Sequence, residues 1–132
     1  MSKMITTYLG GGETKTLHEK NGSEIITDIN AADGGLEKHF SATDLLATAL
    51  AACTTTMIGK MAEARGDNLT GLKTEVEKIM AQNPQRVSKL ILNVTFPPGT
   101  PKEKIDLYAK GAQACPVHNT LHDAVEIAVN VK

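Results

Sequence analysis

The sequence predicts an α+β protein, because strand-like and helix-like segments follow one another along the chain. Three observations support this class. The first 40 residues are rich in β-branched residues and turn signals, a long apolar segment with a helix start signal follows Ser41, and apolar residues alternate with polar ones over 72–96 and 125–131.

The size and charge of the chain limit what it can be. Its 132 residues are about one domain's worth, so we expect a single domain over residues 1–132. A net charge of -1, from 14 basic and 15 acidic side chains, provides no attraction to nucleic acid or to an anionic membrane. No uninterrupted apolar run approaches the ~18 residues of a membrane span, and we see no leader peptide. We therefore expect a cytoplasmic protein that binds neither nucleic acid nor membrane.

The amino-terminal third predicts short strands. Residues 4–9 form an apolar strand that Gly10-Gly11-Gly12 ends, and residues 14–18 form a second. Asn21-Gly22 is a strong hairpin signal and is followed by a third strand over 24–28. Residues 30–39 are expected to form a surface loop.

A long helix is predicted over 45–64. Ser41 as N-cap and Asp44 three residues later resemble a capping box, and Arg65-Gly66 closes the helix. The first half carries no charge on any face, which is typical of a buried helix. Cys53 lies in its middle, in line with Leu46, Leu50 and Met57.

The remaining elements follow in order. We expect a strand over 72–80, a turn at Asn83-Pro84 and a returning strand over 90–96, whose buried face is Leu90, Leu92, Val94 and Phe96. A second capping box over 100–103 starts a helix that runs to about Ala114. Pro116 interrupts that helix and starts a short turn or helix to about His122. The last strand buries Val125, Ile127, Val129 and Val131.

The two cysteines admit three interpretations: inert core residues, metal ligands or a redox pair. Cys53 is mid-helix, so a cation that stabilises its thiolate has to come from elsewhere. Cys115 precedes Pro116 and is a candidate N-cap, where free N–H groups would lower its pKa. The two cysteines lie 62 positions apart, which is compatible with a peroxidatic and a resolving cysteine, in which the second thiol traps a sulfenic acid on the first.

Metal binding is the alternative from another class. Cys115, His118 and His122 have the spacing C-x2-H-x3-H, which a zinc site can use, but no fourth ligand is evident.

Two motifs resemble the OsmC/Ohr family. Residues 40–54, FSATDLLATALAACT, resemble its S-P-x-E-L-L-x-A-A-L-x-A-C-T signature, and residues 115–121, CPVHNTL, resemble its C-P-V-x-x-x-L motif. The resemblance implies an OsmC-like fold, in which antiparallel strands wrap a long buried central helix in an intertwined homodimer with active sites at the interface. Scarce aromatic residues, 3% of the chain, also favour a dimer, because they limit the core that one chain can build.

The resemblance also implies an activity. It is reduction of organic hydroperoxides, and of hydrogen peroxide, through a Cys53 sulfenic acid and a Cys53–Cys115 disulfide that an external dithiol reopens. No haem, flavin or metal is implied. A dimeric small-ligand binding protein with little peroxidase activity is the alternative within the same fold.

Two departures from the family pattern concern the activating groups. Peroxidase branches place an arginine from the amino-terminal strands or following loop, and a glutamate just inside the long helix, beside the reactive cysteine. Here residues 1–40 hold no arginine, and Thr43 stands at the glutamate position with Asp44 beside it. This pattern resembles the general OsmC-like branch and predicts a slower or differently selective peroxidase. The candidate thiolate-activating residues are His18, Lys20, Lys38, His39 and, through orientation of the cation, Asp44.

Overall fold

The computed structural model describes all residues from Met1 to Lys132, and they form two compact units. The first unit is Met1–Leu45 and the second is Leu46–Lys132. The element order confirms the predicted α+β class, whereas the expectation of one domain stays a prediction.

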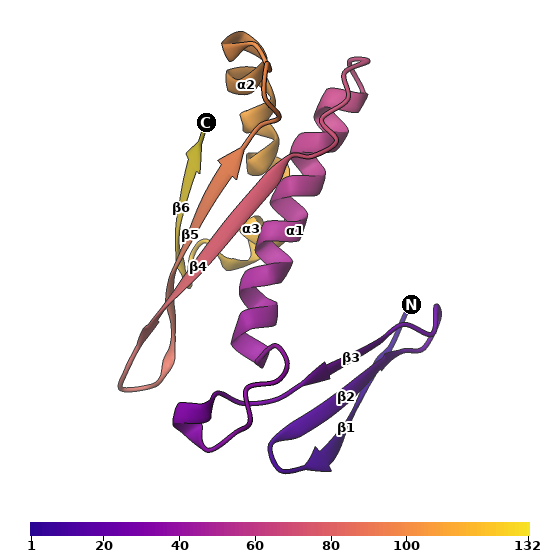
Figure 1. Ribbon diagram of the computed structural model, residues 1–132, viewed down its shortest axis with the longest axis vertical. Coiled ribbons are helices and arrows are strands. Elements are labelled where there is room, and N and C mark those ends of the chain that lie inside the picture. Colours follow the sequence, from indigo (N-terminus) through magenta and orange to yellow (C-terminus); the bar gives the residue numbers. More distant parts are fainter. The chain divides into compact units, whose positions relative to one another are not determined.

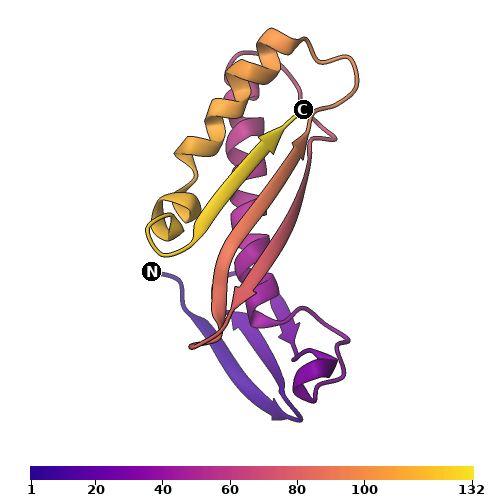
Figure 2. The same ribbon diagram turned by 90° about the vertical axis from the view of Figure 1, so that its left-hand side faces the viewer.

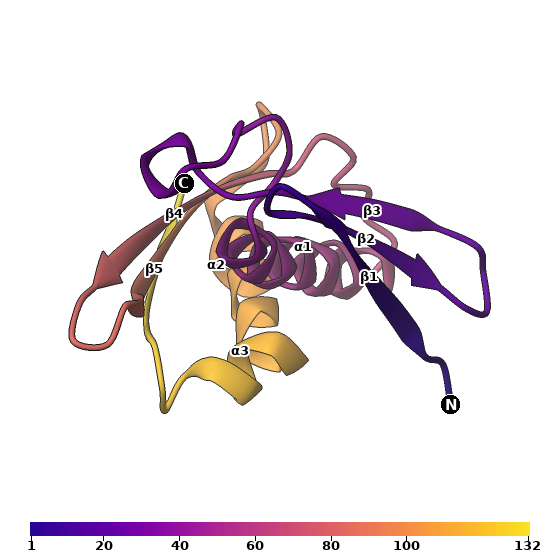
Figure 3. The same cartoon turned by 90° about the horizontal axis from the view of Figure 1, so that it is seen from below.

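The first unit is built on a three-stranded antiparallel sheet (Figure 3). Its strands are β1 (Met4–Gly10), β2 (Glu13–His18) and β3 (Glu24–Thr27). The β1–β2 turn uses three consecutive glycines with φ of 90°, 63° and 84°, and Gly22 has φ of 76° in the β2–β3 turn. Side chains with a Cβ rarely adopt these angles, which is why glycine occupies both turns. The predicted strands and hairpin are confirmed.

A buried carboxylate organises the loop that follows β3. Asp28 is 3% exposed, and its Oδ2 accepts the backbone N–H groups of Lys38 at 2.6 Å and His39 at 3.1 Å. The loop contains a 3-10 turn, η1 (Ala31–Asp33). A Cβ on Gly35 would lie 2.0 Å from the carbonyl oxygen of Ile29, so only glycine fits there. The predicted surface loop is therefore closed by specific hydrogen bonds.

The capping box before the long helix is confirmed. The backbone N–H of Asp44 donates to Ser41 Oγ at 3.1 Å, and Asp44 Oδ2 accepts the Ser41 N–H at 3.0 Å. This reciprocal pair satisfies two N–H groups near the helix start and fixes where the helix begins.

Apolar side chains on both faces of the first sheet are uncovered in the single chain. Strand pairing puts Ile5, Leu17 and Ile26 on one face and Met4, Tyr8 and Ile25 on the other. All six are more than a third exposed. A sheet with two open apolar faces is typical of a surface that contacts another protein.

The second unit packs helices on one face of a second three-stranded sheet (Figure 1). Helix α1 (Ala42–Glu63) leads to the antiparallel pair β4 (Lys73–Ala81) and β5 (Arg86–Thr95). The chain then passes through α2 (Lys102–Ala109), η2 (Lys110–Ala114) and α3 (Pro116–Leu121) to β6 (Glu126–Val131), as Figure 2 shows.

The direction of β6 corrects the expectation of an antiparallel arrangement. It pairs with β5 in parallel, with Leu90 opposite Ile127 and Leu92 opposite Val129. The three helical segments carry the chain back to the end of the sheet where β5 begins, so the next strand runs in the same direction as β5.

The core lies between α1 and the sheet. The predicted inner face of β5 is confirmed, because Leu90, Leu92 and Val94 are completely buried and Phe96 nearly so. Leu50 and Ile58 face them from α1, and Tyr108 joins them from α2. The Tyr108 hydroxyl hydrogen-bonds to Asp67 in the loop after α1, and the hydrogen bond from Lys104 lowers the pKa of that carboxyl.

Helix α1 is buried along one face in the single chain, so the prediction of a helix buried on all faces, which belongs to a homodimer, stays a prediction. Its small residues Ala49, Ala52 and Thr56 form an exposed stripe. By length and composition α1 could also cross a membrane, a test that core helices of soluble proteins pass as well. The sequence prediction considered uninterrupted apolar runs, which the threonines of α1 break.

The second predicted capping box is wrong. Thr100 Oγ1 donates to the carbonyl oxygen of Pro97 at 2.6 Å, and Pro101 is the N-cap of α2 without a side-chain hydrogen bond. Pro97 precedes Thr100 by three residues, so the hydroxyl is used by the turn before the helix.

Candidate active site

The site lies on α1 and at the start of α3. Cys53 occupies the middle of α1, where it is partly exposed and packs with Leu46 and Met57 against the core around Leu50. The predicted alignment of these four residues is confirmed. Partial exposure is what an attacking thiol requires, because its substrate has to reach the sulfur.

Cys115 is the N-cap of α3, as predicted. Its backbone is extended, with φ -69° and ψ 118°, and Pro116 takes the first helical position. The Cys115 Sγ accepts the backbone N–H of His118 at 3.3 Å. The first N–H groups of a helix have no partner inside it, so those that follow Pro116 can point at acceptors outside the helix. Cys115 itself is completely buried.

The structure brings the two free cysteines near enough for Cys115 to act on the pKa of Cys53. Gly111 on η2 makes this approach feasible. A Cβ there would lie 3.0 Å from both the Ile58 Cα and the Met57 carbonyl oxygen of α1. Because glycine has no Cβ, the segment that ends in Cys115 can lie against the backbone of α1.

The surroundings of Cys53 act on its pKa in opposite directions. Burial raises the pKa of the Cys53 thiol, and the hydrogen bond to Cys115 and the charge of a Cys115 thiolate raise it further. A hydrogen bond from the backbone N–H of Val117 lowers it. Two consecutive N–H groups of α3 therefore act on the two sulfurs: that of His118 donates to Cys115 Sγ, and that of Val117 lowers the pKa of Cys53. In the single chain, the net effect keeps Cys53 protonated at neutral pH.

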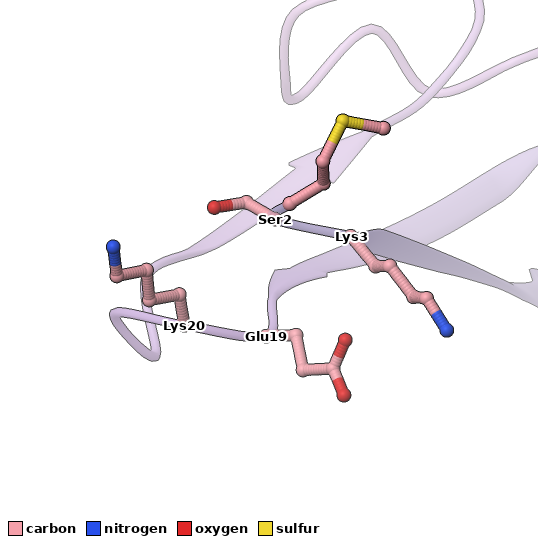
Figure 4. A pocket seen from close by; sticks show the side chains of 5 residues that line it. Ser2, Lys3, Glu19 and Lys20 are labelled. Carbon is pink, nitrogen blue, oxygen red and sulfur yellow. The ribbon is translucent and has the colours of Figure 1, made fainter.

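The predicted activating residues all belong to the first unit, Met1–Leu45. His18 ends β2, where its Nδ1 accepts the Asn21 N–H at 3.2 Å. Lys20 lines a surface pocket of about 440 Å³ with Lys3 and Glu19, and its amine is seen in Figure 4. Lys38 and His39 hold Asp28 through their backbones, and Asp44 caps α1. Their action on Cys53 stays a prediction.

The alternative zinc ligands do not gather. No group of three or more His, Cys, Asp or Glu side chains has metal-binding geometry. The rings of His118 and His122 stack with centroids 5.8 Å apart at 13°, and His122 Nδ1 pairs with Asp123 at 3.1 Å. Stacked rings direct their nitrogens in parallel planes instead of converging on one point.

Sequence reasoning missed two features of this site. Gly111 is a single glycine in a helical stretch, a pattern that can mark close packing, although Gly59 in α1 shares it and has open space around it. The Val117 N–H could have been found from Pro116, since a proline at the first helical position leaves the following N–H groups unpaired. Which sulfur the Val117 N–H acts on depends on how α3 lies against α1, which the sequence alone does not predict.

Comparison with known proteins identifies what the chain is similar to. A family model described as OsmC-like protein matches residues 34–130. Among curated sequences, none matches. Among solved structures, an osmotic stress induced and detoxification response protein from Psychrobacter arcticus is 34% identical, with 100% of this chain and 96% of that chain covered and a TM-score of 0.93.

More distant structures share the fold alone. An OsmC-like protein from Mycoplasma pneumoniae is 20% identical, with TM-score 0.84 over 100% of this chain and 96% of that one. The organic hydroperoxide resistance protein OhrB of Bacillus subtilis is 16% identical, with TM-score 0.69 over 100% and 98%.

Adding a methyl group at Gly111 tests the contact between η2 and α1. We expect Gly111→Ala to destabilise the protein by about 1–3 kcal/mol, because the new methyl meets backbone that cannot move aside. It also slows formation of a Cys53–Cys115 disulfide. Chemical denaturation and timed thiol mapping measure both effects. The control is Gly59→Ala in α1, where a Cβ has nothing within 4 Å and stability rises by up to about 1 kcal/mol. Equal behaviour of the two variants would contradict this packing.

Removing Cys115 tests the electrostatics of Cys53. We expect Cys115→Ala to lower the pKa of Cys53 from its raised value toward the ordinary 9.0, because the raising hydrogen bond and charge are lost while burial stays. The pH dependence of Cys53 alkylation, followed by mass spectrometry, reports the midpoint. Cys115→Ser keeps a hydrogen-bonding group without an ionisable thiol and should fall between. An unchanged or higher midpoint in Cys115→Ala refutes the coupling.

Proposed function

Because the chain belongs to the OsmC-like family, we propose that it is a thiol peroxidase that reduces organic hydroperoxides in oxidative stress defence. The observation that carries the proposal is the nearness of two free cysteines, one partly exposed and one buried, at the start of α3. The hydroperoxide resistance named for the Bacillus subtilis neighbour supports the same chemistry.

The reaction takes two steps on this pair. The Cys53 thiolate attacks the terminal oxygen of a hydroperoxide, the O–O bond breaks, and the alkoxide leaves as an alcohol after taking a proton. Cys53 becomes a sulfenic acid. Cys115 then attacks the Cys53 sulfur, a disulfide forms and water leaves. An external dithiol reopens the bridge by thiol–disulfide exchange. No metal, haem or flavin takes part in this proposal.

The order of the two cysteines follows from their exposure. Cys53 is partly exposed, whereas Cys115 is completely buried behind it. A peroxide therefore meets Cys53 first, and Cys115 is held where it can reach the oxidised sulfur without meeting substrate. The apolar surroundings of Cys53 favour organic hydroperoxides over hydrogen peroxide.

A cation has to complete the site, because the pKa of Cys53 is raised in the single chain. We assign this role to one of His18, Lys20, Lys38 or His39, with Asp44 orienting it. A lysine or protonated histidine stabilises a thiolate but lacks the two-pronged donor geometry of arginine. The enzyme should therefore be slower than peroxidases that carry an arginine. If no cation reaches Cys53, the raised pKa favours the alternative function, a small-ligand binding protein.

We further propose that the active form is a cytoplasmic homodimer. A second copy would cover the two open apolar faces of the first sheet and the exposed stripe of small residues on α1. The stripe lies beside Cys53 on the same helix, so the partner would complete the active site. We propose no binding of this homodimer to nucleic acid or to a membrane.

Peroxide titration with thiol mapping tests the peroxidase mechanism. Reduced protein treated with one equivalent of an organic hydroperoxide should form an intramolecular Cys53–Cys115 disulfide. Cys115→Ser should accumulate a sulfenic acid on Cys53, because the resolving thiol is gone, and Cys53→Ser should consume no peroxide. Mass spectrometry after trapping with a 1,3-dione distinguishes these states. Unchanged peroxide consumption by Cys53→Ser would exclude the peroxidase and leave the binding protein.

A charge in the open apolar sheet tests the dimer. We expect light scattering to give twice the chain mass for the natural sequence, and Ile5→Glu to shift it to the single-chain mass, because a buried unpaired carboxylate opposes association. Lys3→Glu, just before β1, alters charge without removing an apolar contact and should stay dimeric. A monomeric natural protein, or an Ile5→Glu dimer of unchanged affinity, counts against this surface.

A further inference from the structure

His118 carries an atom that the proposed mechanism leaves unused. Its Nδ1 is buried and has no hydrogen-bond partner. A buried polar atom without a partner costs stability, and active sites are among the places where such atoms persist because the group they serve is transient. The other unpartnered buried atom of this kind is Asp28 Oδ1 in the first unit.

His118 lies in the first turn of the helix that the proposed resolving cysteine, Cys115, caps. With Cys115 as N-cap and Pro116 as first helical residue, His118 is the third residue of α3. Helical side chains tilt toward the amino terminus, and the third residue is the one whose side chain reaches back to the N-cap residue in a capping box. The backbone N–H of His118 already donates to Cys115 Sγ at 3.3 Å.

His122 provides a natural comparison one turn later. Its ring stacks on His118, but its residue is exposed and its Nδ1 pairs with Asp123 at 3.1 Å. The two imidazoles therefore differ: Nδ1 of His118 is buried and has no hydrogen-bond partner, whereas Nδ1 of His122 pairs with Asp123 at the surface.

We propose that His118 moves the proton in the disulfide-forming step. This inference rests on the proposed peroxidase function and deepens it by naming the acid–base group of the second half-reaction. A neutral imidazole has one nitrogen with a free lone pair, and imidazole is the side chain most used for proton transfer near neutral pH. The cap hydrogen bond of the same residue keeps the Cys115 sulfur in place meanwhile.

The proton balance of the step is closed. The His118 nitrogen accepts the proton of the Cys115 thiol as that sulfur attacks Cys53. The S–S bond forms, the S–O bond of the sulfenic acid breaks, and the leaving hydroxide takes the proton back from the imidazolium. The Cys53 sulfur is reduced, the Cys115 sulfur is oxidised, and one water is released. His118 ends neutral, ready for the next cycle.

Replacement of His118 by glutamine separates proton transfer from capping. Glutamine keeps the backbone N–H on Cys115 Sγ and is itself suited to the third helical position, but it cannot shuttle a proton. After one equivalent of an organic hydroperoxide, quenched samples are trapped with a 1,3-dione and mapped by mass spectrometry. We expect disulfide closure in His118→Gln to slow by roughly 10²-fold, the lower end of what a positioned acid–base group contributes. Sulfenic acid on Cys53 should accumulate.

Two further variants make the result specific. His122→Gln removes the stacked ring without touching the cap and should close the bridge at the natural rate. His118→Ala should be slow, and added imidazole should restore its closure rate, which a merely structural defect would not allow. Natural-rate closure in His118→Gln, or slow closure in His118→Ala without rescue by imidazole, overturns the proposal. If the natural protein itself consumes no peroxide through Cys53, the proposed function fails instead.

Discussion

The site depends on one local constraint, the missing N–H of Pro116. Proline ends the 3-10 segment before it and supplies the first residue of α3, which leaves Cys115 as N-cap. The next two N–H groups then have no partner inside the helix: that of His118 donates to Cys115 Sγ, and that of Val117 lowers the pKa of Cys53. A residue that can donate at position 116 would allow the helix to continue and would remove the cap.

Local signals predicted most of what positions the site. The capping pair Ser41 and Asp44 determines where α1 begins, and the spacing of Cys53 from Leu46, Leu50 and Met57 determines which face carries it. The inner face of β5 was equally clear, because strand alternation needs only neighbouring residues. The same reasoning failed at Thr100, where two local hydrogen bonds compete for one hydroxyl and the turn, not the helix cap, takes it.

Long-range features could not be predicted in this way. The contact between Cys53 and Cys115 depends on how closely η2 approaches α1, and this depends on the absence of a side chain at Gly111. The parallel direction of β6 depends on the whole path from Thr95 to Glu126. The exposed stripe of α1 was missed because an apolar composition does not distinguish a helix buried in its own chain from one that a second chain would cover.

For the peroxidase that we propose, the surroundings of Cys53 place substrate binding and reactivity in conflict. Apolar neighbours suit an organic hydroperoxide, but the same burial raises the pKa of the thiol, and proximity to Cys115 raises it further. The closeness that allows a disulfide thus opposes the thiolate that must form first, and one N–H from Val117 does not outweigh both effects. A positive charge brought to Cys53 resolves the conflict, because it stabilises the thiolate without adding polar groups to the pocket walls. Residues 1–40 hold no arginine, so we assign that charge to one of the lysines or histidines of the first unit.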